Sequence, residues 1–297
     1  MSGVEGAIFG HGFFDSATVH VALAVGAAVA LVSGVVGVFA VIRGQAFAGE
    51  ALSDVGATGA SAAFLIGAPS LWGFVSAGVG AAAVMELIGI QRPRGRDLAT
   101  GIVLGASLGL AALFLYLDTT YHSTTGATAT ILFGSLFAID SSTTPVIIGL
   151  SLVALVLVVL VQRPLLLSSL NADMAAARGI RVRLVGALYL LALAVAVSLS
   201  ALTIGAILGT ALLVGPAATA LRVTKRPGTA MLIAPLIGVA ATWLGVVLAY
   251  DSFYWPPHGH GWPVSFFVVA VILSLYLLAG LPRRRRARAV AAPDGVR

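Results

Sequence analysis

Two carboxylates interrupt a stretch of small and apolar residues at positions 46–59. Glu50 and Asp54 are four residues apart, so on a helix their side chains lie on the same face. Two carboxylates this close repel each other unless a cation or a proton lies between them. The hydroxyls of Ser53 and Thr58 place further oxygen atoms nearby. The pattern predicts a cation or proton site, unless the membrane span begins later and both acids are solvated.

A histidine pair forms a second candidate metal site, in the segment 254–263, Tyr-Trp-Pro-Pro-His-Gly-His-Gly-Trp-Pro. The imidazoles of His258 and His260 are suited to receive a metal ion and pass it to a channel. Trp and Tyr in such a loop are also typical of the aromatic belt at a membrane–water interface. Two histidines alone do not decide between a metal site and an ordinary interfacial loop.

Sequence motifs for catalysis are absent from the chain. A P-loop needs a lysine that directly follows a glycine, whereas the single lysine, Lys225, follows Thr224. Neither an H-E-x-x-H motif nor a dinucleotide-binding fingerprint occurs, and the chain has 0 Cys, which excludes a cysteine nucleophile and thiolate metal ligands. We therefore expect no catalytic residues, no enzymatic activity and no permanently bound cofactor.

Membrane-spanning helices are the elements that must position these side chains. The chain has 297 residues, of which 59% are hydrophobic and 9% charged, whereas a soluble domain carries about 25% charged residues. Apolar runs recur along the chain, each close to the roughly 20 residues that a helix needs to cross a bilayer. We predict an all-α, polytopic helix bundle with nine spans, at 17–42, 46–67, 71–90, 98–117, 145–162, 184–201, 203–221, 229–250 and 264–281.

Two segments do not fit a single crossing. The 38 residues of 184–221 carry no charge, and as one helix they would be about 57 Å long, against a hydrocarbon core of about 30 Å. This segment must therefore fold back, and we place the turn near 198–203. Residues 127–139 are apolar but too short to cross, so we predict a half-helix or an interfacial helix there.

All 17 Lys and Arg residues fall on one side of this nine-span arrangement. The positive-inside rule makes that side cytoplasmic, which places the N-terminus outside and the C-terminus inside a multi-pass protein of the cytoplasmic membrane. The same arrangement puts all five histidines at the outer face. The net charge of +6 then reflects topology, and we expect no nucleic-acid binding. Residues 1–282 form the membrane domain, and the basic tail 283–297 is expected to contact anionic lipid.

The longest predicted cytoplasmic loop, 164–183, contains a short helix near 168–179. Ser169, Asn171 or Asp173 would cap its start, and Gly179 would cap its end. An Ala-rich helix with little charge is suited to docking into a groove on a partner protein, although a plain connector would have the same pattern.

Two further features have both a functional and a structural interpretation. Gly215 and Pro216 lie in the span 203–221, where the proline would kink or end the helix near its cytoplasmic face. This bend is either part of a gate or a static kink. Glu86 lies one turn before Arg92–Arg96, and we expect it to be an interfacial residue paired with an arginine.

Three stretches resemble the membrane permease subunits of ATP-binding-cassette (ABC) importers for zinc, manganese and iron(II). They are 43–59, 171–182 and 210–222. The last, Thr-Ala-Leu-Leu-Val-Gly-Pro-Ala-Ala-Thr-Ala-Leu-Arg, carries the family's LL-x-x-P-A-A-T-A signature, and 132–137 is similar to its L-F-G-S-L motif. The resemblance covers about residues 20–282.

The resemblance implies a homodimeric permease, or a pseudo-twofold pair, with a metal path at the dimer interface. It also implies that two cytosolic ATPase subunits dock on the loop 164–183 and that an extracytoplasmic metal-binding protein delivers the ion. The divalent metal ion would be the transported substrate. The residues that the resemblance assigns to ATPase coupling are Asn171, Asp173, Ala175, Ala176 and Gly179.

The sequence departs from the family pattern at two sites. Glu50 and Asp54 stand where the family commonly has Asp and His, so the spacing is kept but the imidazole is lost. An all-oxygen pair favours harder ions such as manganese, whereas imidazole suits zinc. Asn171 stands where the family's loop has Asp.

The function that these features favour is a permease for manganese, zinc or iron(II). A competing hypothesis is a secondary carrier driven by an ion gradient, with Glu50 and Asp54 as proton or sodium sites, although we detect no inverted repeats of the kind common in such carriers. A permease for siderophore or corrinoid cargo is a third hypothesis, against which the P-A-A-T-A stretch argues. A membrane anchor or sensor subunit that transports nothing is the fourth hypothesis.

Overall fold

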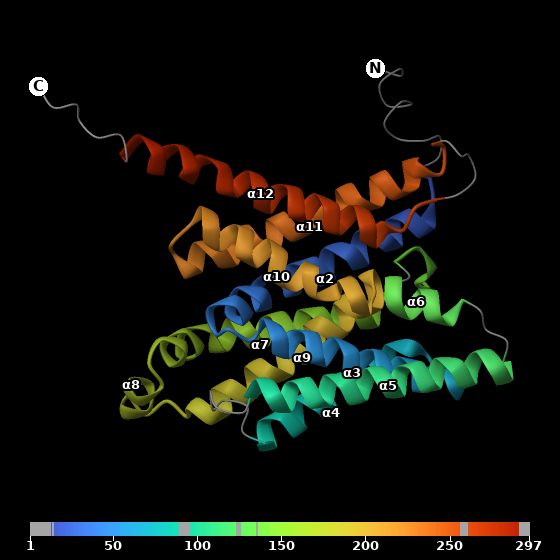
Figure 1. Ribbon diagram of the computed structural model, residues 1–297, viewed down its shortest axis with the longest axis horizontal. Coiled ribbons are helices and arrows are strands. Elements are labelled where there is room, and N and C mark those ends of the chain that lie inside the picture. The colour runs from blue at the N-terminus through green and yellow to red at the C-terminus, as the bar shows by residue number, and fades with distance from the viewer. Residues whose placement is uncertain are drawn as a thin grey trace, which may run out of the picture.

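The regular structure of the chain is entirely helical in the part that the computed structural model describes, residues 13, 15–88, 96–122, 126–134, 136–255 and 261–290 (Figure 1). The helices are α2 (Ala17–Ile42), α3 (Ala46–Leu65), α4 (Ser70–Ile88), α5 (Arg96–His122), α6 (Ala127–Phe133), the 3₁₀ helix η1 (Leu136–Ala138), α7 (Thr144–Leu170), α8 (Ala172–Ala177), α9 (Val182–Ile204), α10 (Ala206–Val223), α11 (Pro227–Ser252) and α12 (Val264–Val290).

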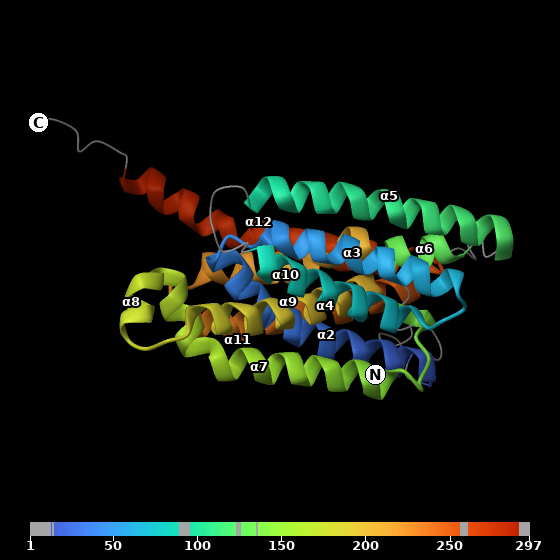
Figure 2. The ribbon, with the colours of Figure 1, turned by 90° about the horizontal axis from the view of Figure 1, so that it is seen from below.

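The long helices run side by side, with α8 at one end of the bundle and α6 at the other (Figure 1, Figure 2). We call these the α8 end and the α6 end. In both α2 and α9, 72% of the apolar span is buried, against 17% in α5 and 22% in α7. The first two therefore form the centre of the bundle and the last two its periphery. Several large apolar side chains of α7 are exposed, namely Leu152, Val153, Val156 and Leu160.

Each of the nine predicted spans coincides with one helix. Among the described residues, α2, α4, α5, α7, α9 and α11 contain spans long and apolar enough to cross a membrane. In α10 and α12 the apolar helical segments are shorter, Gly209–Val223 and Val264–Gly280. The helix α3 carries Glu50 and Asp54, which lower its hydropathy although much of it is buried. The multi-pass bundle is confirmed, while the nine crossings and their orientation stay predictions.

The chain reverses at Gly205, later than the predicted turn at 198–203. Its φ of +103° and ψ of 152° belong to a region that is essentially restricted to glycine. The reversal packs against Gly134, which separates α6 from η1 and has a φ of +81°. A Cβ on Gly134 would lie 2.5 Å from the carbonyl carbon of Ile204. The short helices found within the predicted 127–139 segment therefore pack directly against the α9–α10 turn.

The predicted boundary between the span 145–162 and the short helix at 168–179 is wrong. Helix α7 continues through Pro164 to Leu170, so residues 168–170 belong to it and the short helix is the six-residue α8. Of the three predicted caps, Asn171 is the one used, and its side chain accepts a hydrogen bond from the Met174 N–H at 3.0 Å. The C-cap residue is Arg178, and the predicted cap, Gly179, follows it with a φ of +79°.

A substitution at Gly205 tests the packing of the α9–α10 turn against α6. Gly205→Ala should lower the stability of the purified protein by about 1–3 kcal/mol, because the new Cβ requires an unfavourable backbone conformation and collides with the Leu132 carbonyl. The matched control is Gly149→Ala in α7, where an added Cβ meets no atom within 4 Å. Thermal unfolding in detergent measures both, and an equal effect of the two changes would contradict the assigned turn.

Candidate functional site

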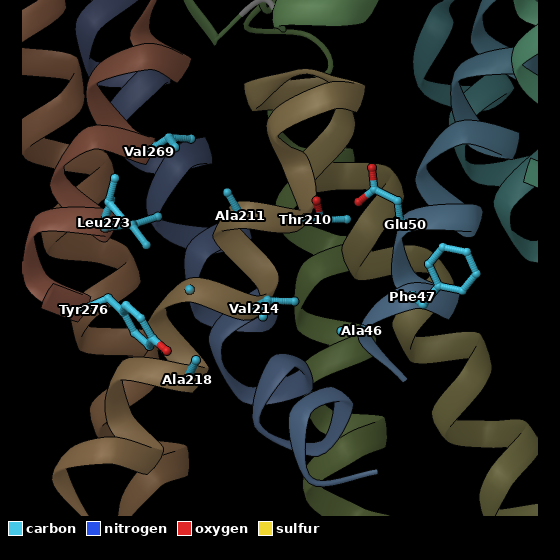
Figure 3. A pocket seen from close by; sticks show the side chains of 12 residues that line it. Ala46, Phe47, Glu50, Thr210, Ala211, Val214, Ala218, Val269, Leu273 and Tyr276 are labelled. Atoms are coloured by element: carbon cyan, nitrogen blue, oxygen red, sulfur yellow. The ribbon is translucent and has the colours of Figure 1, made fainter. Parts of the chain in front are cut away.

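A groove between α3, α10 and α12 contains one of the two predicted acids (Figure 3). Its volume is about 630 Å³, and most of its lining is apolar. The side chains that bring oxygen atoms to it are Glu50, Thr210 and Tyr276. Gly215, one of the predicted gate residues, also lines it. A carboxylate on a mostly apolar wall makes this groove the candidate site.

The position of Glu50 follows from the register between α3 and α10. The Ser53 hydroxyl donates a buried hydrogen bond to the Ala206 carbonyl at 3.0 Å. These two helices run in opposite directions, so one turn nearer the α8 end Glu50 lies opposite Thr210. Figure 3 shows the carboxylate of Glu50 directed across the groove towards Thr210.

Thr210 is a site residue that the sequence patterns do not predict. Within the described chain its hydroxyl makes no hydrogen bond, whereas Thr219 on the same helix donates to the Gly215 carbonyl at 2.7 Å. The Thr210 oxygen is therefore available to a ligand in the groove. Its position at the start of the stretch 210–222 is visible in the sequence, but its proximity to Glu50 depends on the packing of α3 against α10.

Asp54 lies one turn closer to the α6 end of α3 and is 7% exposed. Its carboxylate has no hydrogen bond to any residue that the structure describes, and it is not part of the groove lining. The helix α3 begins at Ala46, before both acids, so both lie within it, and the position at which this span enters the membrane stays a prediction. The structure thus places Glu50 in the groove and Asp54 beside it, inside the protein.

One copy of the chain does not assemble a complete metal site by itself. Across the described residues, no group of three or more His, Asp or Glu side chains comes close enough to hold a metal ion. His258 and His260 lie outside the described residues. The aromatic residues next to them pack together, with Trp262 stacked on Phe267 at 6.1 Å between ring centroids and edge-on to Trp255 at 6.4 Å.

The remaining predicted residues have clear positions. Pro216 is buried inside α10, which continues to Val223, so the proline does not end the helix. A Cβ on Gly215 would collide with Ile272 of α12, which makes this a point of close helix contact.

Glu86 forms an ion pair with Arg183 at 3.4 Å, and such an exposed pair contributes little stability.

The helix α8 presents most of its surface to the outside. Asn171, Asp173 and Ala176 are exposed, whereas Ala175 is fully buried. The amide of Ile180 closes the end of the helix by donating to the Ala175 carbonyl at 3.1 Å. Ala175 therefore anchors α8 to the bundle, and the exposed residues are those available to a partner.

Comparison with known proteins identifies the family. The sequence model of the ABC 3 transport family matches residues 15–279. The chain belongs to this family. As a member of the ABC 3 transport family with six helices apolar enough to span a bilayer in its described part, it is a multi-pass protein of the cell membrane.

Several proteins similar to this chain are manganese transport proteins by name. The manganese transport system membrane protein MntC of Halalkalibacterium halodurans is 34% identical over 174 residues, which is 59% of this chain and 58% of MntC. The manganese import system permease protein ScaB of Streptococcus pneumoniae is 32% identical over 163 residues, 55% of this chain and 56% of ScaB. The matched region thus spans less than two thirds of the length of these relatives.

A solved structure matches nearly the whole fold. PsaBC from Streptococcus pneumoniae, in complex with Fab, superposes with a TM-score of 0.78 at 26% identity. The superposition covers 94% of this chain and 97% of the matched chain. The overall arrangement of helices is therefore shared over nearly the whole chain.

Proposed function

We propose that this chain is the membrane permease subunit of an ABC importer for divalent metal ions, with manganese as the favoured ion. The observation that carries the proposal is the oxygen-only set on α3 and α10, in a family whose members include named manganese permeases. Carboxylate and hydroxyl oxygens suit Mn²⁺, whereas zinc and iron(II) sites more often include imidazole. The match to the ABC 3 transport family and the similarity to named manganese permeases favour a metal-ion permease over a secondary carrier or a siderophore permease.

The two acids supply the electrostatic part of the transport site. Each lies in or beside an apolar groove, where the mutual repulsion of Glu50 and Asp54 is screened less than in water. A divalent cation between them relieves that repulsion, and the Thr210 hydroxyl is placed to add a neutral oxygen ligand. A second copy of the chain across the groove would raise the number of carboxylates at the site to four. Few ligands from each copy keep binding weak enough for the ion to leave.

Separate cytosolic ATPase subunits would supply the energy by docking on α8. The junctions α2–α3 and α10–α11 lie at the same end as α8 (Figure 1, Figure 2), and they carry Arg43, Lys225 and Arg226. The positive-inside rule makes this end cytoplasmic. An extracytoplasmic metal-binding protein would then deliver the ion at the α6 end, where His258 and His260 would receive it, and the tail 283–297 would contact anionic lipid.

Removal of both charges from α3 tests the transport site. In liposomes that contain the chain with its ATPase subunits, Glu50→Gln combined with Asp54→Asn should reduce Mn²⁺ uptake and Mn²⁺-stimulated ATP hydrolysis at least about tenfold. A tenfold loss corresponds to about 1.4 kcal/mol of lost attraction for the ion. Protein yield should not change, because the amides have the size of the acids. Asp140→Asn, at an exposed acid, is the control. Unchanged uptake in the double variant would remove these residues from the path.

Proline substitutions at two positions of α8 test whether this helix is the docking element for the ATPase subunits. Ala176→Pro should disrupt the helix interior and abolish both co-purification with the ATPase subunits and coupled transport. Ala172→Pro is the matched control, because Ala172 is the first helical residue after the cap Asn171, a position where proline is tolerated. If Ala176→Pro retains both properties, α8 is not the docking element.

A further inference from the structure

Arg43 connects three segments at the α8 end of the bundle. Its Nε donates to the Gln45 side-chain oxygen at 3.2 Å. Its Nη1 donates to the Ser169 hydroxyl at 3.1 Å and, more weakly, to the Ser168 hydroxyl at 3.4 Å. The guanidinium carbon also lies 5.6 Å from the centre of the Tyr189 ring. A single side chain at the end of α2 thus joins the start of α3, the end of α7 and the face of α9.

The two serines tie the guanidinium to the segment that carries α8. Their hydroxyls accept from Arg43 and donate to the Leu165 carbonyl, at 2.9 Å from Ser168 and 2.6 Å from Ser169. Only Leu170 and the cap residue Asn171 separate Ser169 from the start of α8. A partner that displaces α8 therefore acts directly on the residues that hold Arg43.

Gln45, which accepts a hydrogen bond from the Arg43 Nε, connects the guanidinium to α3 and so to the groove. Gln45 precedes α3 and is 5% exposed, and its carbonyl accepts the Gly49 amide at 3.0 Å in the first turn. Glu50 is the next residue along that helix. Gly44, with a φ of +61°, lets the chain turn sharply between α2 and α3, so the start of α3 stays close to Arg43.

Tyr189 gives the arginine a fixed support. Its ring is fully buried, its hydroxyl donates to the Val36 carbonyl at 3.4 Å, and it packs edge-on to Phe39 with 6.2 Å between ring centroids. The guanidinium is well suited to this position because its planar fork can donate in several directions while its face packs on an aromatic ring. Movement of the end of α7 relative to this support must either break the serine hydrogen bonds or pull on the start of α3.

We propose that Arg43 is a positioning residue for transport, which transmits displacement of the ATPase-docking segment to the start of α3 and thereby to Glu50. The proposal rests on the proposed function as a permease powered by separate ATPase subunits. The helix α8 packs mainly on α7 and α9, and α3 packs mainly on α4, α5, α9 and α10. Through its side-chain hydrogen bonds, Arg43 therefore connects the end of α7, which leads into α8, to the residue that precedes α3.

The experiment uses the complete complex in liposomes and measures Mn²⁺ transported per ATP hydrolysed, together with basal ATP hydrolysis. Arg43→Met should leave co-purification and basal hydrolysis unchanged and reduce the transport ratio at least about fivefold. Ser168→Ala combined with Ser169→Ala should reduce the ratio in the same direction while the arginine is retained. Arg43→Lys should recover part of the ratio, because an ammonium can bond one serine but lacks the planar fork. Arg163→Met, at an exposed arginine of α7, is the charge-matched control.

The outcomes separate this inference from the function on which it rests. A transport ratio in Arg43→Met within twofold of the unmodified complex would overturn the coupling role, and so would an equal loss in Arg163→Met. If Arg43→Met does not assemble, the serine pair decides, and an unchanged ratio there overturns the proposal. If the unmodified complex transports no Mn²⁺, the proposed function fails and the inference fails with it.

Discussion

The repulsion between two carboxylates held one turn apart inside an apolar bundle is the constraint on which the rest of the site depends. Asp54 is 7% exposed and Glu50 lies on an apolar groove wall. A charge in such surroundings is costly unless it is compensated. The protein keeps both acids on α3 and fixes that helix to α10 through the Ser53–Ala206 hydrogen bond. In the proposed mechanism, a transported cation would supply the compensation, and its departure would restore the repulsion that favours binding of the next ion.

Close approach of backbones makes this arrangement rigid around the site. Gly205 allows α10 to return along α9 immediately, and Gly134 lets the α6–η1 segment pack on that turn. Gly59 of α3 and Gly73 of α4 pack backbone against backbone in the same way. Small residues of this kind let helices pack in lipid through van der Waals contact, where no hydrophobic effect drives association. The helices around α3 are thus closely packed, and the groove on its α10 and α12 side remains open.

The positions of the helices can be predicted from the sequence because apolar runs bounded by arginines follow directly from the cost of charge in lipid. The exact ends of two helices, α7 and α9, cannot be predicted in this way. The turn predicted at 198–203 comes too early, since Ser200 and Thr203 donate to carbonyls one turn back, at 2.9 and 3.0 Å, and the helix continues. The predicted end of the span 145–162 is also too early, because Pro164 is tolerated inside α7. The pairing of side chains between helices is harder still to predict from the sequence. The spacing of Glu50 and Asp54 predicts a shared face, but their separate surroundings and the position of Thr210 depend on tertiary register, which local patterns do not specify.

Anomalous X-ray scattering at the manganese absorption edge, from crystals of the complete complex grown with Mn²⁺, tests the central claim most directly. The account predicts a manganese peak beside the carboxylates of Glu50 and Asp54, within reach of the Thr210 hydroxyl. It also predicts that this peak disappears in the variant that combines Glu50→Gln with Asp54→Asn. A peak that persists in this variant, or a manganese site found only away from α3, would contradict the account.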